Sequence, residues 1–529
     1  MKCTRSNCFK LLFFVITLFN QLSLSSQIEG SNLFATDQVV TIALDFPQND
    51  FWQQLEYNYD NIDENGSVYI PANLTLTDAT GTYSFDSVGV RLKGNSSGMH
   101  PGDKKSFKID FNKYISGQNY DGLKKLNFSN GFKDPTFMRE KLFFDLCRER
   151  GVAAPRANYA NVVYNGQAWG FYTVIEQIDD QFLDWRIGDD DGNLFKAGSN
   201  FGSGDGEASL QYMGPNESSY ESSYELKSNE DENDWSDLIE FISFINNSSD
   251  ADFEIGLPER LDLGPFLSSV AFNILFSNLD TYTLSARNYY LYHNMSTDQW
   301  EWIKWDANET FGSYGNGQNM EELDIDFYEG NRPLLERVFE NEVFMSQYTS
   351  EICLLLNTVF NPNYLNPIID DYKTLIQDDV YADENKMFSN AAFDTNIETN
   401  LGGGGGPGGG GPGGGGPGGG TTYGLKSFIQ ARYDYLSSVV SCEQYSNIES
   451  LASKKVEVYP NPISTSFTID GLDSYPVPYS IKGLNGVVLK SDVLHHDSQV
   501  IDISKLESNL YFLQINGAVF KLIKQFILI

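Results

Sequence analysis

The sequence predicts an α+β protein, in which a β-rich N-terminal region precedes a helical region and a small C-terminal β-sandwich. Three observations lead to this prediction. Strand-like alternation predominates over residues 39–178, helical patterns predominate from about residue 230, and short, regularly spaced strands return after residue 455. Strands followed by helices are typical of α+β folds. With 529 residues, 41% of them hydrophobic, the chain is long enough for two or three domains.

The first elements of the N-terminal region are strands. Apolar and polar residues alternate in four segments: 39–46, 66–78, 82–94 and 104–111. Each is bounded by glycine, proline or acidic turn residues, so we expect four strands that share one sheet.

A helix over residues 134–151 follows these strands. Asp134 is a suitable N-cap, Pro135 suits the first helical position, and Gly151 can close the helix. Two further strands are predicted at 157–166 and 168–178, joined by an Asn-Gly turn, which favours a hairpin.

The helical region contains one β interruption and one glycine-rich segment. Aromatic, strand-like runs lie between residues 289 and 306, each next to an acidic or amide residue. Residues 402–420 consist of glycine and proline and cannot bury apolar surface. Because an amphipathic helix follows at 424–440, we interpret the glycine-rich segment as a loop within this region and place the linker near 446–454.

Charge and targeting signals restrict the function. The net charge of −36 repels phosphate backbones, which argues against a nucleic-acid partner. Residues 1–26 have basic residues, an apolar run at 11–19 and a small-residue end, which predicts a signal peptide cut after Ser25 or Ser26. The apolar run is too short to cross a bilayer, so we expect a secreted or cell-surface protein without a transmembrane segment.

Cysteines are few. Removal of the signal peptide leaves Cys147, Cys353 and Cys442, too few for a disulfide framework. Cys353 and Cys442 both lie in helical patterns and could pair outside the cell, although the sequence leaves this open. The absence of a CxxC motif argues against a zinc cluster.

The remaining residue types narrow the possible chemistry. The chain has four histidines and no GxSxG motif, which disfavours a zinc hydrolase and a serine hydrolase of the α/β type. Carboxylates are abundant, so a paired-acid glycosidase and an oxygen-liganded Mg²⁺ site both remain possible.

The order of elements favours the second possibility. A loop with the small residues Gly94, Ser96 and Ser97 precedes a lysine-bearing strand and a helix. Two strands follow, and then acids at the ends of a helix and a strand, at Asp280 and Asp306. This is the element order of a protein kinase: phosphate loop, strand lysine, helix, catalytic loop and metal-binding aspartate.

Several stretches carry a resemblance to a known family. They are VGVRLKGNSS (88–97), KKSFKIDF (104–111), DPTFMREKLFFDL (134–146), GVAAPRANYANVVYNGQAWGFYTVIEQID (151–179), NLD…RNYYLYH (278–293) and WDANETFG (305–312). With these motifs the chain resembles the CotH family of spore-coat-protein-H-like atypical protein kinases over residues 38–445. The resemblance implies a two-lobed atypical protein-kinase-like fold, with a β-rich first lobe and a helical second lobe.

The resemblance also assigns roles to individual residues. Asp280 corresponds to the catalytic aspartate, and Asp306 to the metal-binding aspartate of the kinase DFG motif. Asn288 is expected as an accessory metal ligand, although it lies eight residues past Asp280, a longer spacing than in ordinary kinases. Asn308 occupies a position where the family often has a second acid, which puts the metal affinity in doubt.

For the nucleotide, we expect Lys105 to be the strand lysine. It shares a strand face with Phe107 and Ile109, whereas Lys108 points the other way.

Four other residues complete the expected nucleotide site. Arg91, Lys93 and Asn95 flank the phosphate loop, and Glu176 either ends a strand at the hinge or pairs with the lysine.

The C-terminal residues 455–529 form a separate unit. Its YPNP stretch (459–462), its IDISKL…LYFLQI block and its late KLIK resemble the C-terminal sorting domain of the type IX secretion system. The resemblance implies that this unit contacts the secretion machinery and that the protein is exported across an outer membrane.

Together these expectations define an exported kinase that transfers a phosphoryl group from Mg-ATP, or Mn-ATP, to protein Ser or Thr hydroxyls. The acceptor protein is not specified by the sequence. Three alternatives remain open: a catalytically weak scaffold for surface binding, a nucleotidyl transferase, and a glycosidase, which would have a sugar cleft rather than a lysine-lined one.

Overall fold

The computed structural model describes residues 28–35, 38–62, 66–94, 97–98, 102–198, 207–314, 317–402 and 421–442, together with seven strands and a few neighbouring residues between 457 and 523. The predicted signal peptide, Asn95, residues 403–420 of the glycine-rich segment and the predicted linker lie outside the described residues.

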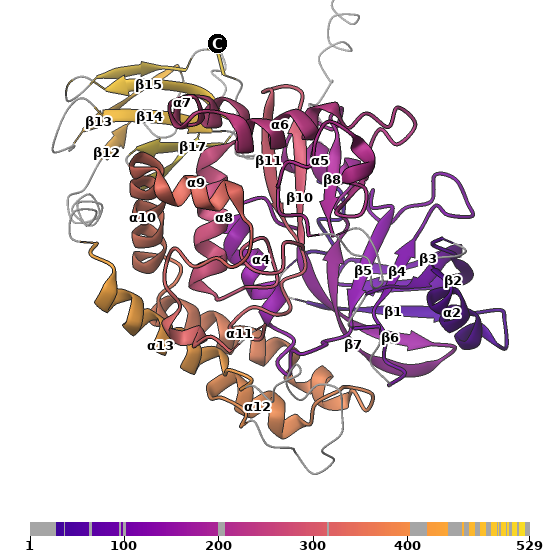
Figure 1. The fold of residues 1–529 in the computed structure, drawn as a ribbon. Coiled ribbons are helices and arrows are strands. Elements are labelled where there is room, and N and C mark those ends of the chain that lie inside the picture. The colour runs from indigo at the N-terminus through magenta and orange to yellow at the C-terminus, as the bar shows by residue number, and fades with distance from the viewer. Residues whose placement is uncertain are drawn as a thin grey trace, which may run out of the picture.

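The N-terminal region is a closed seven-stranded barrel in the order β1-β2-β3-β4-β5-β7-β6 (Figure 1). Its strands are β1 (Val39–Asp45), β2 (Ile70–Asp78), β3 (Gly81–Leu92), β4 (Phe107–Asp110), β5 (Lys125–Ser129), β6 (Ala157–Tyr164) and β7 (Gln167–Glu176). All pairs are antiparallel except β1 with β6, which run parallel and close the barrel. The predicted strands are present, and the structure adds β5 and the helix α2 (Phe51–Asp60).

Alternation along the strands separates a packed interior from an outer face. Phe107 and Ile109 of β4 are fully buried inside the barrel, and Phe107 stacks on Phe128 of β5 with ring centroids 4.3 Å apart. Lys108 lies between them on the outer face and is only half-buried. The predicted hairpin turn between β6 and β7 is confirmed, because Asn165 and Gly166 have φ angles of 48° and 76°, as a type I′ turn requires.

The helix after β5 begins later than predicted. Helix α4 spans Arg139–Glu149, so the predicted start at Asp134 and Pro135 is wrong. The Asp134 carboxylate instead accepts hydrogen bonds from the Thr136 and Arg139 amides, which folds residues 134–138 into a turn. The predicted end holds, since Gly151 follows the helix with φ +80°.

The helical region contains nine helices in its described part, and α8 among them is almost entirely buried. Its helices are α5 (Asp180–Arg186), α6 (Ser236–Asn247), α7 (Asp250–Arg260), α8 (Leu263–Leu275), α9 (Pro333–Glu340), α10 (Glu342–Asn357), α11 (Pro362–Ala382), α12 (Asn390–Glu398) and α13 (Leu425–Val439). Short 3₁₀ turns lie at Glu217–Ser219 and Met320–Glu322. A second sheet has the order β11-β10-β8-β9 and is formed by β8 (Leu194–Ala197), β9 (Tyr224–Leu226), β10 (Tyr289–Asn294) and β11 (Gln299–Lys304).

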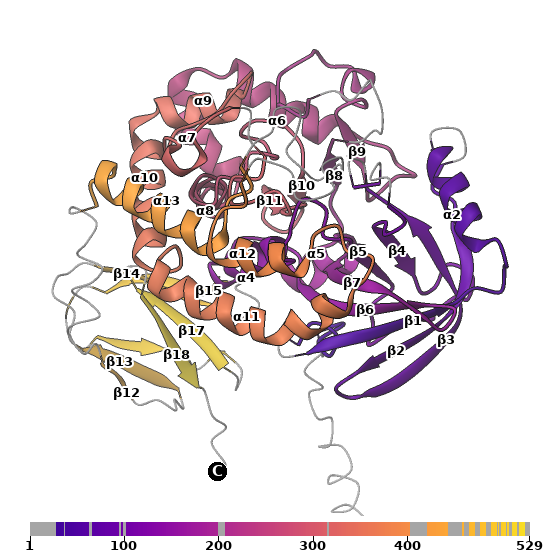
Figure 2. The ribbon, with the colours of Figure 1, turned by 90° about the horizontal axis from the view of Figure 1, so that it is seen from below.

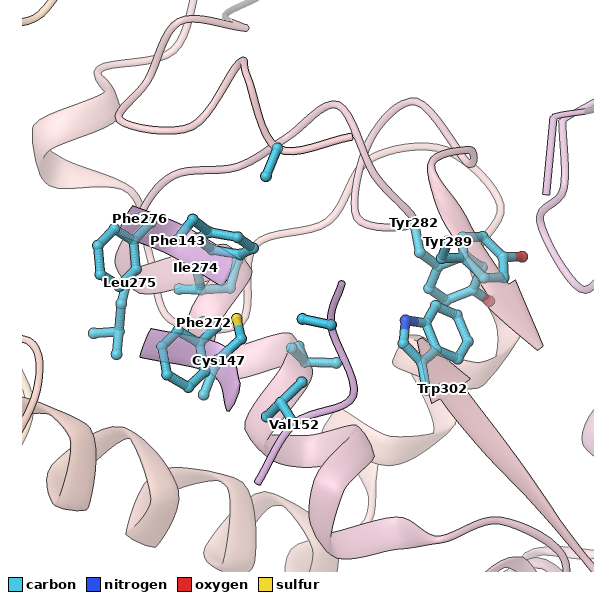
Figure 3. Packing of buried hydrophobic residues seen from close by; sticks show 14 of the residues in the cluster. Phe143, Cys147, Val152, Phe272, Ile274, Leu275, Phe276, Tyr282, Tyr289 and Trp302 are labelled. Atoms are coloured by element: carbon cyan, nitrogen blue, oxygen red, sulfur yellow. The ribbon is translucent and has the colours of Figure 1, made fainter. Parts of the chain in front are cut away.

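Aromatic packing fixes α8 against its neighbours (Figure 3). Phe143 of α4 meets Phe272 and Phe276, at the end of α8, edge to face. On the other side, Tyr289 of β10 stacks on Trp302 of β11 with ring centroids 4.2 Å apart. Because α8 and the β10–β11 hairpin are both packed rigidly, the loops at their ends have defined positions.

A buried ion pair joins the barrel to the helical region. Figure 2 shows α11 running toward strands β6 and β7. Just past its end, Asp383 accepts a 2.5 Å hydrogen bond from Lys104, and both side chains are 1% exposed. Asp383 also accepts the Phe171 amide of β7, and Asp379 accepts the Asn161 amide group of β6. These contacts hold the two regions together at one edge.

The structure pairs Cys353 of α10 with Cys442, just after α13, in a disulfide, and Cys147 is buried with a free thiol. Within the described residues, no helix is long and apolar enough to cross a membrane.

The C-terminal unit consists of two small sheets. One has the order β12-β13-β16 and the other β15-β14-β17-β18. Their bounds are β12 (Glu457–Tyr459), β13 (Ser466–Asp470), β14 (Val477–Lys482), β15 (Val488–Leu494), β16 (Val500–Asp502), β17 (Leu510–Ile515) and β18 (Ala518–Ile523). Phe467, Ile481 and Leu513 belong to one shared core, so the sheets pack on each other.

Candidate active site

A cleft of about 650 Å³ lies between the outer face of the barrel and the loops that follow α8 and β11. It brings together five of the predicted site residues, namely Arg91, Lys93, Asp280, Asn288 and Asp306. Residues more than 200 positions apart in the sequence therefore line one cleft, as the predicted site requires.

The barrel wall of the cleft is a set of cross-strand rows. Arg91 of β3 lies opposite Lys108 of β4, Lys108 opposite Asn127 of β5, and Asn127 opposite Ile175 of β7. All four side chains line the cleft, because residues opposite one another in antiparallel strands share a face. Residues two positions away also line it, including Lys93, Ser106, Ser129, Thr173 and Gln177.

Strand alternation places the other two predicted residues away from the cleft. Lys105 lies two residues before Phe107, which points into the barrel interior, so the alternation places it on the same side of the strand. Its Nζ donates a hydrogen bond to the Gly98 carbonyl oxygen at 2.8 Å. Neither Lys105 nor Glu176 lines the cleft. The face that we predicted to carry the nucleotide lysine is therefore the packed one, and Lys108 lies on the cleft face.

Glu176 ends β7, as predicted, but its partner is not a lysine. Its carboxylate pairs with the Arg156 guanidinium and accepts the Trp185 indole N–H at 2.9 Å. With 2% of its surface exposed, Glu176 serves to anchor the end of β7.

Asp280 follows the buried helix α8, and the loop that carries it is tightly bonded. The Ser277 hydroxyl donates to the Met320 carbonyl oxygen at 2.7 Å. The buried Arg332 guanidinium donates to the Tyr282 and Leu284 carbonyl oxygens. The loop backbone is therefore held on both sides, which fixes the position of Asp280.

Asp306 follows β11, and a buried lysine sets its position. Lys304 Nζ donates to the Ser269 carbonyl oxygen and to the Asn273 side-chain oxygen of α8, each at 2.6 Å. This ties the end of β11 to the helix that precedes Asp280. Asp306 itself has a φ of +52°, a conformation that costs energy in a non-glycine residue and is common at functional sites.

Asn288 connects the two acids. Tyr289 pairs with Lys304 across the β10–β11 hairpin, so Asn288 and Asp306 lie at the same end of it. The Asn288 amide nitrogen donates to the Asp280 carbonyl oxygen at 2.9 Å, which orients the side chain on the Asp280 loop.

The acids of the cleft affect one another. Burial raises the pKa of Asp280, the Ser285 hydrogen bond opposes this, and the charge of Asp306 raises it further. Desolvation within the cleft also raises the pKa of Asp306, and the charges of Lys93 and Lys196 oppose the rise. Among the described residues, no hydrogen bond or ion pair satisfies the Asp306 carboxylate, which leaves it available to a cation.

The sequence interpretation missed two further acids of the cleft. Glu140 lies in the first turn of α4, and Glu309 lies three residues after Asp306. Burial and the charge of Asp306 raise the pKa of Glu140 to about 8, and the charge of Lys93 opposes this rise. Burial and the charge of Asp280 raise the pKa of Glu309 to about 7. The ion pair with Lys133, 2.9 Å from the Glu309 carboxylate, opposes this rise.

Basic residues face these acids. Burial lowers the pKa of Lys93 to about 8 against the opposing charges of Asp306 and Glu140, and its Nζ lies 5.3 Å from the centre of the Trp305 ring. Lys196 of β8 and Arg287 also line the cleft. Gly94 turns the chain beside Lys93 with φ +97°, where an added Cβ would lie 2.1 Å from the Ser97 hydroxyl oxygen. Basic residues of both the barrel and the helical region therefore line the cleft together with its acids.

Comparison with known proteins agrees with this geometry. A family model described as "CotH kinase protein" matches residues 90–402, more than half of the chain. The chain belongs to the CotH kinase family. A search of curated proteins found "Inner spore coat protein H" of Bacillus subtilis (strain 168), which is 29% identical over 270 residues, covering 50% of this chain and 70% of that protein.

A second family model, "Secretion system C-terminal sorting domain", matches residues 457–529. This CotH kinase family member therefore carries a type IX sorting domain, which indicates export across the outer membrane and contact with the secretion machinery.

Membership of the CotH kinase family implies the use of ATP, and the donor set of the cleft fits a hard cation. Mg²⁺ prefers oxygen ligands and usually keeps several waters, taking one or two carboxylates and phosphate oxygens. Asp306 offers a carboxylate, and Asn288 and Asn308 line the same cleft with carboxamides. In the described part of the chain, no group of three or more His, Cys, Asp or Glu side chains could hold a metal unaided. Asp306 and the two carboxamides would therefore supply only part of the ligands of such a cation.

The acids predict a pH dependence of the CotH domain's stability. The folded pKa of Glu140, about 8, lies above its unfolded value near 4.5, so the folded state binds more protons between these pH values. Stability therefore falls as pH rises across this window. Without divalent cations, we expect thermal unfolding temperature to decrease from pH 5.5 to pH 8, and Glu140→Gln to flatten the decrease. An unchanged slope in the variant would show that Glu140 does not titrate in this way.

Proposed function

We propose that this chain is an exported kinase that transfers the γ-phosphoryl group of Mg-ATP to a protein Ser or Thr hydroxyl. The observation that carries the proposal is the cleft itself. Asp280, Asn288 and Asp306 line it together with Arg91, Lys93 and Lys108 of the barrel. In this proposal the barrel and the helical region act as the two lobes of an atypical kinase fold, with the nucleotide between them.

The basic wall is the proposed phosphate site. Lys93 and Lys196 stand near Asp306, since their charges act on its pKa. Arg91 and Lys108 continue the wall on neighbouring strands. Polyphosphate needs such an array of cations because charge-assisted hydrogen bonds to phosphate are strong. A sugar cleft would not need them, so the lining favours a kinase over a glycosidase.

Asp306, with Asn288 and Asn308, is the proposed cation site. A bound Mg²⁺ would neutralise charge that develops on the phosphate oxygens. Glu140 lies close enough to influence both Asp306 and Lys93, and we propose that it holds Lys93 in position once the phosphates are bound.

Asp280 is the proposed catalytic residue. In this mechanism its carboxylate accepts the proton of the acceptor hydroxyl as the hydroxyl oxygen bonds to the γ-phosphorus and ADP departs. Because the Asp280 loop is held by Arg332 and Asn288, the carboxylate would orient the hydroxyl without rearrangement. Most of the rate enhancement would come from positioning and charge stabilisation.

The competing proposal is a kinase-like scaffold that no longer turns over ATP. The sorting domain favours it, because ATP is scarce outside the cell and this domain directs the chain there.

A thermal-shift measurement distinguishes the two. A ligand that binds only the folded state stabilises it by about 2.7 kcal/mol at a hundred times its Kd. We expect Mg-ATP to raise the unfolding temperature of the full chain, and ATP with EDTA to have a much smaller effect. Equal and negligible shifts with and without metal would support the scaffold.

A further inference from the structure

Arg287 is a basic residue of the cleft that has no role in the proposed phosphate site. Arg287 lines the cleft one residue before Asn288. Within the described residues, its guanidinium makes one long hydrogen bond, from Nε to the Ser285 carbonyl oxygen at 3.4 Å, and no ion pair. Arg332, which binds the same loop, is by contrast satisfied by the Tyr282 and Leu284 carbonyl oxygens and by Glu207. Within the part of the chain that the structure describes, Arg287 is therefore a half-buried cation of the cleft that makes no ion pair.

The backbone holds Arg287 in this place. The residues on either side of it, Ala286 and Asn288, have φ angles of 51° and 59°. The Arg287 Cβ lies 3.0 Å from the position that a Cβ added at Gly198 would take, so the glycine just after β8 allows this close approach without a shift. The arginine stem is thus packed, while its charged end remains open.

Different basic residues of the cleft act on Asp280 and on Asp306. Burial raises the pKa of both carboxyl groups. The charges of Lys93 and Lys196 lower the pKa of Asp306, whereas the charges of Arg287 and Lys133 lower the pKa of Asp280. Lys133 is already paired with Glu309 at 2.9 Å. Among the described residues, Arg287 is therefore a cation near the proposed catalytic carboxylate that is not engaged in an ion pair.

We propose that Arg287 selects an acceptor peptide that carries an anionic group, a carboxylate or a phosphate, close to the hydroxyl that is phosphorylated. This inference rests on the proposed kinase function and deepens it by naming the substrate class. A chain with a net charge of −36 otherwise repels acidic peptides, so a dedicated cation at the acceptor position determines which of them can react.

The test uses the full chain and a panel of peptides built around one serine in a neutral sequence. Aspartate, phosphoserine, asparagine or lysine is placed in turn at each nearby position, and kcat/KM for labelled phosphate transfer is measured. At one position we expect aspartate and phosphoserine to exceed asparagine by about tenfold or more, the size of one charge-assisted hydrogen bond. Arg287→Gln should reduce this ratio to about one, and Arg287→Glu should favour the lysine peptide.

Two controls make the result specific. Arg260→Gln changes an exposed arginine of α7 and should keep the preference. A retained Mg-ADP thermal shift shows that the Arg287 variants are folded.

Two outcomes would overturn the inference while leaving the kinase proposal intact. One is equal kcat/KM for all peptides. The other is an equal loss in Arg287→Gln for acidic peptides, neutral peptides and water, which would mean that Arg287 acts on the transferred phosphoryl group. If no peptide is phosphorylated and Mg-ATP gives no thermal shift, the proposed function itself fails and the inference fails with it.

Discussion

Asp306→Asn is expected to lower phosphoryl transfer by about 10²–10³ or more, since removing one electrostatic element of an active site commonly has this effect. The carboxamide keeps the shape of the side chain but removes the charge that would hold the cation. The Asp306 carboxylate has no partner among the described residues, and burial raises its pKa. The variant should therefore be as stable as the wild type, or more so, when divalent cations are absent.

The measurement is labelled phosphate transfer at saturating Mg-ATP, with thermal unfolding of the same samples. Asp191→Asn provides the matched control, because Asp191 is an exposed acid outside the cleft. Transfer by Asp306→Asn at more than about a tenth of the wild-type rate would remove Asp306 from the proposed mechanism.

Asp383→Ala is expected to lower the free energy of unfolding by about 3–5 kcal/mol, because it leaves a charged lysine buried without its partner. Lys104 is 1% exposed, lies between the Phe137 and Tyr172 rings, and has Asp383 as its ion partner. Burial lowers the pKa of Lys104 to about 8 even against the attraction of Asp383. Loss of the pair should also loosen α11 from the barrel.

Urea unfolding checks this prediction. The double variant Lys104→Met/Asp383→Leu should recover most of the lost stability, since it removes both charges. Glu259→Gln breaks the exposed pair with Arg260 and should change stability by less than about 1 kcal/mol. If Asp383→Ala were no worse than Glu259→Gln, the pair would not hold the two regions together.

Periodicity predicted the barrel strands because the interior is packed with alternate residues such as Val90 and Ile109. It could not predict closure. The parallel pairing of β1 with β6 joins segments that are more than 100 residues apart, and no local pattern encodes it. Strand β5 was missed because it has only five residues and begins at the second of two consecutive lysines.

The sequence pointed to Asp280 and Asp306, which line the cleft, but not to Lys108, which lines it as well; the roles of these residues stay predictions. Asp280 and Asp306 stand at the ends of apolar elements, where a polar residue suggests a function. The choice between Lys105 and Lys108 depends on which face of β4 is inside the barrel. Both faces of that strand pack against other parts of the protein. Which face points into the barrel becomes clear only from the closed sheet, in which Phe107 and Ile109 are fully buried.

Glu140 illustrates a second limit. A helix that began at Pro135 would place Glu140 in its second turn, whereas the observed start at Arg139 places it in the first turn, facing the cleft. The Asp134 carboxylate accepts the Thr136 and Arg139 amides, which holds residues 134–138 in a turn and delays the start of the helix.

The intact masses of the protein and of an acceptor protein after incubation with Mg-ATP test the central claim most directly. A kinase adds one or more phosphoryl groups, and the gain should disappear with EDTA and in the Asp280→Ala variant. A gain equal to AMP would assign the cleft to nucleotidyl transfer. No gain on either molecule, with a folded protein and Mg-ATP bound, would contradict the proposal that this cleft transfers phosphate.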